Sequence, residues 1–95
     1  MAKSQYRSEM EVMHEILSIV ANGGRFGTNV SHISAKANIS HYAAMEKCQK
    51  ILRAELIEQH IDKRNRIFRI TEKGFAFIKE LDRFQNIVCS FNLKY

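Results

Sequence analysis

The segment at residues 56–74, LIEQHIDKRNRIFRITEKG, limits the possible fold more than any other part of the chain. Apolar and polar side chains alternate on each side of its centre, and this period of two is typical of β-strands. At the centre, the stretch DKRN at 62–65 places a turn-forming residue on each side of two cations. The segment therefore predicts a β-hairpin with a basic tip, with strands at 57–61 and 66–70.

Three helices are predicted before this hairpin, because apolar residues recur there at helical spacing. Ser8 and Glu11 fit a capping box at the start of the first helix. Thr28 is the expected cap of the second helix, and Ser40 is the expected cap of the third. The expected ranges are 9–21, 29–37 and 41–54. A short helix, a tight turn and a longer capped helix form a helix-turn-helix.

A fourth helix is predicted at 72–92, with Thr71 as its cap. Its large apolar residues are spaced 4, 3, 4, 3 and 4 apart, which is a heptad seam. The seam residues are Phe77, Leu81, Phe84, Val88, Phe91 and Tyr95. A body made of the preceding residues covers only about half of so long a helix, so we expect the seam to pair with a second copy. The alternative is that the helix folds back entirely on the first helix of its own chain. Phe75 and Ile78 lie off the seam and are expected to pack on the body.

The order of these elements predicts a mainly α fold with a small β-hairpin. Three helices, a cationic hairpin and a further helix make a winged helix-turn-helix, in which the hairpin is the wing. The charge of the chain is concentrated in the same region. Residues 25–69 carry nine cations and four anions, which by itself equals the net charge of +5 of the whole chain. A basic patch concentrated in this way suits a polyanion, although a solvated basic surface is the alternative.

The outward face of the helix at 41–54 has the chemistry that reads DNA bases. Lys can donate to guanine, Gln can pair with adenine, and a small Ala allows close approach. The candidates are Ser40, Tyr42, Ala43, Glu46, Lys47, Gln49, Lys50 and Arg53. In the wing, the candidates for gripping the DNA backbone are Lys63, Arg64, Arg66 and Arg69. A polar outer face is also found on any surface helix, so the assignment depends on the wing and on the charge distribution.

Other classes of protein find little support in the residues. No Gly-rich phosphate loop, metal-ligand set or nucleophile–base pair occurs, so we expect no enzyme, no metal and no cofactor. No apolar run approaches the roughly 20 residues of a membrane span, and the start lacks the apolar segment of a signal peptide, so we expect a cytoplasmic protein. Cys48 and Cys89 are expected to be buried, reduced thiols, with a disulfide or a redox sensor as alternatives.

The sequence resembles the small archaeal winged-helix DNA-binding proteins, including the roughly ten-kilodalton chromatin proteins that dimerise through a C-terminal antiparallel coiled coil. The resemblance spans about residues 10–92 and is carried by Ile39-Ser40, Leu56-Ile57 and the stretch FRITEKG at 68–74. Two positions depart from the family's pattern. Glu55 stands where a glycine is common, and Lys47-Cys48 replace an aromatic–leucine pair.

The resemblance implies a double-stranded DNA-binding protein, either a homodimeric transcription regulator or a nucleoid-associated protein. The helix at 41–54 would enter the major groove, and the wing would lie on the backbone or in the minor groove. Residues 1–71 would form the DNA-binding domain and residues 72–95 the coiled-coil dimerisation helix. The alternative function is a protein-interaction module that uses its aromatic C-terminal helix for a different partner. No small-molecule ligand is evident.

Overall fold

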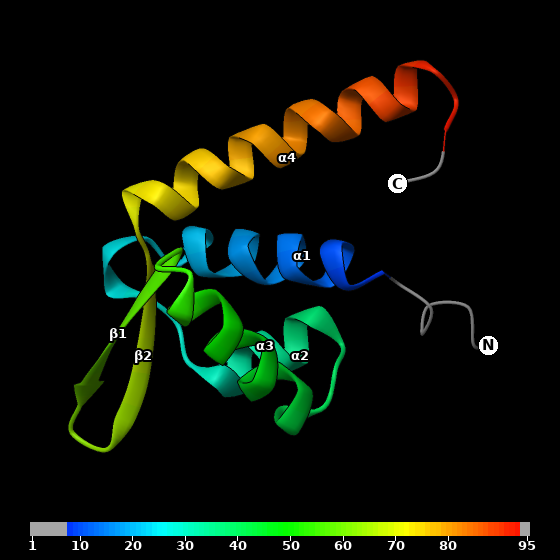
Figure 1. Ribbon diagram of the computed structural model, residues 1–95. Coiled ribbons are helices and arrows are strands. Elements are labelled where there is room, and N and C mark those ends of the chain that lie inside the picture. The colour runs from blue at the N-terminus through cyan, green and yellow to red at the C-terminus, as the bar shows by residue number, and fades with distance from the viewer. Residues whose placement is uncertain (1–7, 94–95) are drawn as a thin grey trace.

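The computed structural model describes residues 8–93 and contains the predicted elements in the predicted order (Figure 1). The elements are α1 (Glu9–Asn22), a short 3-10 helix η2 (Gly24–Phe26), α2 (Val30–Ala37), α3 (His41–Arg53), β1 (Ile57–Asp62), β2 (Asn65–Ile70) and α4 (Glu72–Ser90). The expected mainly helical fold with one small hairpin is confirmed. Each predicted boundary is within two residues of the observed one.

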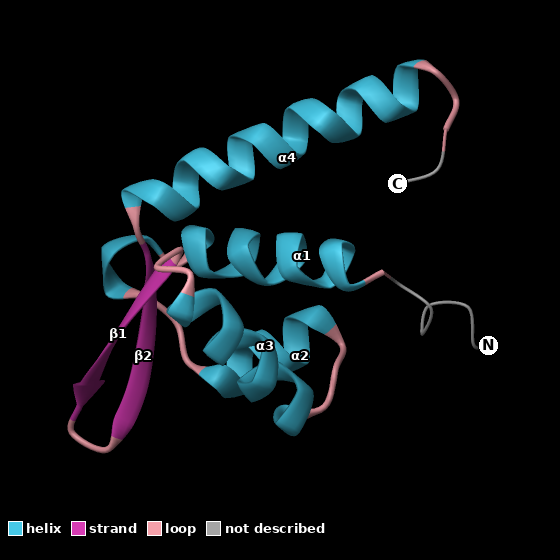
Figure 2. Ribbon diagram, in the orientation of Figure 1, coloured by secondary structure: helices cyan, strands magenta, loops and turns pink. Residues whose placement is uncertain are grey.

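The helices form layers around α1. Figure 2 shows α1 between α4 on one side and the α2–α3 pair on the other, with the hairpin of β1 and β2 extending away from the helices. His14 of α1 and Asp82 of α4 are joined across this layer, with 2.9 Å between the imidazole Nε2 and a carboxylate oxygen. The helix-turn-helix and the tip of the hairpin therefore lie on the side of α1 opposite to α4, whereas the base of the hairpin adjoins the start of α4.

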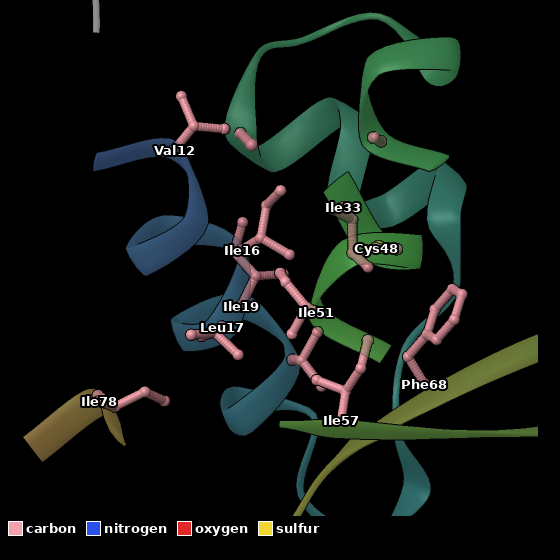
Figure 3. Packing of buried hydrophobic residues seen from close by; sticks show 13 residues of the cluster. Val12, Ile16, Leu17, Ile19, Ile33, Cys48, Ile51, Ile57, Phe68 and Ile78 are labelled. Atoms are coloured by element: carbon pink, nitrogen blue, oxygen red, sulfur yellow. The ribbon is translucent and has the colours of Figure 1, made fainter. Parts of the chain in front are cut away.

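One hydrophobic core holds these layers together (Figure 3). Ile16 and Leu17 of α1 meet Ile33 of α2 and Ile51 of α3, and all four side chains are buried. The strands contribute Ile57 and Phe68, and α4 contributes Ile78. Burying a large aliphatic or aromatic side chain contributes about 1.5–3 kcal/mol, so this cluster fixes the orientation of α3 and of the wing base.

Three of the four predicted helix caps are confirmed. Ser8 and Glu11 form the capping box, Ser40 accepts a hydrogen bond from the amide of residue 43, and Thr71 accepts one from the amide of Gly74. The fourth prediction is wrong, because Asn29 caps α2 instead of Thr28. Thr28 is extended and buried, and its backbone pairs with that of Phe68. This pairing extends the strand contact through Thr28, so α2 begins one residue later and the next residue caps it.

The hairpin is longer than predicted by one residue in each strand. Asp62 pairs with Asn65, so only Lys63 and Arg64 remain in the turn. At the other end, Thr28 adds a backbone bridge to β2, donating to the Phe68 carbonyl at 2.9 Å and accepting from the Phe68 amide at 2.8 Å. Near the core, β2 is therefore hydrogen-bonded on both edges, to β1 and to Thr28. At the tip it is bonded to β1 alone.

Glu55 forms the turn from α3 into the wing. The small archaeal winged-helix proteins that the sequence resembles commonly have glycine at this position. The Glu55 φ of 65° lies in the left-handed region, which an L-residue enters at a cost. The hydroxyl of Thr71 donates to the Glu55 carbonyl at 2.8 Å, and Lys73 lies 3.9 Å from the Glu55 carboxylate. The segment that follows the wing thus stabilises the turn that precedes it.

Two expectations about buried side chains differ from the structure. Phe75, expected on the body, is exposed, whereas Ile78 is buried as expected. Gly74 is the residue that contacts the body, and Phe75 lies about 100° further around the helix. The Phe75 ring therefore faces solvent, with Lys79 above it. Cys48 is buried as expected and burial raises its pKa to about 11, but Cys89 is exposed. Both thiols are free.

Candidate nucleic-acid interface

The exposed side of α3 presents a polar stripe with helical spacing. Tyr42, Glu46, Gln49 and Arg53 are 4, 3 and 4 residues apart, and Tyr42 is 78% exposed. Together with Met45 and Lys50, these side chains line a shallow groove of about 360 Å³. Ser40 lies at the start of the stripe, but its hydroxyl is engaged in capping α3. Ala43 is half-buried beside the stripe.

The two lysines of α3 lie at the edge of this stripe and contact α1. Lys50 Nζ is 2.7 Å from Glu9 Oε2, and Lys47 Nζ is 3.7 Å from the same oxygen. The Lys50 hydrogen bond, together with the charge of Lys47, holds the pKa of Glu9 below its ordinary value. The same bond raises the pKa of Lys50. The helical pattern predicts that both lysines face outward, and the structure places them against a carboxylate of their own chain.

The wing contains two kinds of cation. Lys63, Arg64 and Arg66 are exposed, and within residues 8–93 no carboxylate forms an ion pair with them. Arg69 is different, because it is half-buried at the wing base. Its guanidinium donates to the Arg25 carbonyl at 3.2 Å and lies 3.4 Å from the Glu58 carboxylate, an electrostatic contact without a hydrogen bond. We therefore separate Arg69, which supports the wing, from the three cations at its tip.

A second hollow joins the wing tip to the helix-turn-helix. It has a volume of about 380 Å³. Its lining residues are Asn29, Val30, Ser31, His41, Met45, Arg64, Asn65 and Arg66. Arg66 bridges the two parts, with its guanidinium 4.0 Å from the Met45 sulfur. The first residues of α2 and His41 are not among the predicted site residues. The pairing of Thr28 with Phe68 brings α2 beside the wing, and no local pattern indicates it.

The predicted seam on α4 is divided between the inside and the outside of the protomer. Leu81 and Val88 are buried, and Phe77 is half-buried against the core. Phe84 and Phe91 are 55% and 69% exposed, and Ile87 between them is 49% exposed. We call Phe84, Ile87 and Phe91 the α4 stripe. Tyr95, the last residue of the seam, lies outside the described residues.

Residues 8–93 contain neither a cluster of metal ligands nor a membrane-spanning helix. No cluster of three or more His, Cys, Asp or Glu side chains there is arranged to hold a metal ion. None of the helices in this part of the chain combines the length and apolarity of a membrane span.

A helix-turn-helix whose exposed helix lies beside a basic two-stranded wing defines the winged-helix class of DNA-binding folds. The chain belongs to the winged helix-turn-helix family, whose pattern its sequence matches over residues 6–88. No curated protein sequence is similar enough to count as a relative.

Solved structures share this fold at low sequence identity. AF1382 from Archaeoglobus fulgidus is 24% identical with a TM-score of 0.69, over 82% of this chain and 88% of that one. Sso10a-2, a DNA-binding protein from Sulfolobus solfataricus, is 20% identical with a TM-score of 0.68, over 88% and 87%. ZitR, a zinc-responsive MarR family member from Lactococcus lactis, is 22% identical with a TM-score of 0.69, over 90% of this chain and 60% of that one. The expected similarity to small archaeal winged-helix proteins is thus confirmed at the level of the fold.

Proposed function

We propose that this protein binds double-stranded DNA as a homodimer and acts as a transcription regulator or a nucleoid-associated protein in the cytoplasm. In this proposal residues 1–71 form the DNA-binding domain, residues 72–95 dimerise, and no cofactor or catalytic step is involved. The observation that carries the proposal is the group of three exposed cations at the wing tip, Lys63, Arg64 and Arg66, beside the polar stripe of α3.

The geometry gives the two elements different roles. An α-helix fits the major groove of B-DNA, where base edges carry a distinct donor and acceptor pattern. Tyr42, Gln49 and Arg53 can present a hydroxyl, an amide and a guanidinium to those edges, and Glu46 can accept from a cytosine amine. The wing tip carries three exposed cations beside a single carboxylate, that of Asp62, and such cations neutralise phosphates without reading sequence. Arg64 and Arg66 also line the hollow beside α2, so a backbone phosphate can approach both elements there.

The dimer part of the proposal is supported by the α4 stripe. Phe84, Ile87 and Phe91 follow one another at helical spacing on a helix that carries charges of both signs, so two copies can meet without a large repulsion. Each of these side chains is about half or more exposed, so burying the remainder against a second copy would contribute about 1–2 kcal/mol per side chain. The same exposure favours the second candidate function, an interaction module in which α4 binds a different protein.

One titration tests the DNA-binding proposal. Fluorescence anisotropy with labelled duplex DNA, repeated over a range of salt concentrations, should give a dissociation constant that rises steeply with salt. If a dimer neutralises about eight phosphates, the logarithm of the association constant should fall with a slope of about −7 against the logarithm of salt concentration. Random duplexes should show a comparable slope at lower affinity if base reading occurs. A slope near zero, or no binding at low salt, would refute the proposal.

A further inference from the structure

Within residues 8–93, Glu9 is the one carboxylate from another helix that neutralises cations of α3. It lies in the first turn of α1, and one of its carboxylate oxygens reaches both Lys47 and Lys50, which are three residues apart on α3. The separation of 2.7 Å from Lys50 is typical of a charge-assisted hydrogen bond. One carboxylate thus engages two ammonium groups in the way that a phosphate oxygen would.

The local structure of α1 does not require the Glu9 carboxylate. Ser8 and Glu11 complete the capping box between themselves, with hydrogen bonds of 3.1 and 2.8 Å. The Glu9 side chain is exposed, and exposed ion pairs stabilise folds little because water and salt screen them. Its charge nevertheless changes the surface next to it, because the cations Lys47 and Lys50 are held toward α1. The side chain of Lys47 is only 21% exposed in this arrangement.

We propose that Glu9 is an internal phosphate surrogate that restrains the DNA affinity of α3. In the free protein its carboxylate engages Lys47 and Lys50, so a DNA phosphate has to compete with it for these two ammonium groups. This inference rests on the proposed DNA-binding function, and it assigns to Glu9 a role as a positioning residue that sets the affinity.

Replacing the carboxylate by an amide tests this role. Glu9→Gln should bind duplex DNA about two- to fivefold more tightly, which is the range that one or two exposed ion pairs can supply. The salt slope of the dimer should become steeper by about two, because each of its two protomers presents one more net positive charge to the phosphates. Glu72→Gln is the matched control, since it removes the same charge from an exposed position in the first turn of α4. It should change the affinity by less than half as much.

A double variant shows whether Glu9 acts through the lysines. In a Lys47→Gln, Lys50→Gln background, Glu9→Gln should lose most of its effect on affinity. Melting curves of every variant establish that folding is intact. If wild-type protein binds DNA but Glu9→Gln changes affinity no more than Glu72→Gln, or keeps its effect without the two lysines, the role of Glu9 is refuted and DNA binding stands. If wild-type protein fails to bind at low salt, the proposed function fails and this inference fails with it.

Discussion

Gly74, in the first turn of α4, rests directly on the backbone carbonyl of Leu56, the residue that leads into β1. A β-carbon built on Gly74 would overlap the Leu56 oxygen and the end of the Ile70 side chain. The same Leu56 carbonyl also accepts a hydrogen bond from the Thr71 amide at 3.2 Å. The first turn of α4 therefore packs directly against the residue that leads into β1, and only glycine permits so close a contact.

We expect Gly74→Ala to destabilise the protein by about 1–3 kcal/mol or more, because backbone atoms cannot move aside as a flexible side chain can. Chemical denaturation followed by circular dichroism measures this change. Gly24→Ala is the control, since Gly24 has a φ of +59° but no atom within 4 Å of an added β-carbon. It should cost only the backbone strain, about 1 kcal/mol. Equal losses of stability at the two positions would contradict the close contact between Gly74 and the Leu56 carbonyl.

The wing-tip cations should control DNA affinity without controlling sequence preference. Replacing Arg64 or Arg66 by Gln should weaken binding to specific and random duplexes by similar factors. It should also reduce the magnitude of the salt slope by about 0.9 for each phosphate that the variant no longer neutralises. Lys79→Gln on α4 is the matched control and should leave both quantities nearly unchanged. A change confined to one DNA sequence would instead assign the altered residue to base reading.

Arg69 should behave differently from the wing-tip cations. Its guanidinium holds the Arg25 carbonyl and faces Glu58, so Arg69→Gln should mainly lower the free energy of unfolding, by about 1–2 kcal/mol. Thermal melting of this variant beside Arg64→Gln distinguishes the two roles. A large fall in DNA affinity with unchanged melting would place Arg69 among the residues that bind phosphate.

The α4 stripe should determine the oligomeric state. Substituting Glu for both Phe84 and Phe91 should yield a folded monomer, because four charges would then be buried in the interface between two copies. Light scattering coupled to size exclusion gives the mass directly. Phe75→Glu makes the same kind of change at an exposed position of α4 off the stripe, and it should leave the dimer intact. A dimer that survives the double substitution would contradict the assignment, as would a wild-type monomer.

The two thiols should differ in reactivity. Cys89 is exposed and should react rapidly with a chromogenic disulfide reagent, while Cys48 should react only as fast as the protein opens. Burial raises the pKa of Cys48 from 9.0 to about 11. The unfolded chain therefore loses this proton first, and the contribution of Cys48 to stability should decline as pH rises from about 9 to 11. The variant Cys89→Ser should lack the fast phase, and a fast phase that persists in it would contradict the burial of Cys48.

Features set by neighbouring residues can be predicted from the sequence, and contacts between distant residues cannot. The caps at Ser8, Ser40 and Thr71 depend on the next three residues, so local patterns are sufficient. Thr28 resembles a cap for the same local reason, but its pairing with Phe68, 40 residues further along the chain, transfers that role to Asn29.

The candidate site shows the same limit. The stripe on α3 follows from helical spacing alone, whereas the position of Lys50 depends on Glu9, 41 residues away. The seam on α4 is recognisable from its spacing, but spacing does not show that Leu81 and Val88 are buried within the protomer. The remaining stripe can be identified only once the packing of α4 on α1 is known.

The backbone bridge between Thr28 and Phe68 gives the hairpin a gradient of stiffness. Near Phe68 the second strand is bonded on both edges, and toward the tip the ladder ends in the two-residue turn at Lys63 and Arg64. The hairpin is therefore held firmly at its base and is more flexible at its tip. Backbone order parameters should fall from Phe68 toward Arg64, and this compliance would let the terminal cations follow duplexes of different curvature while α3 keeps its position.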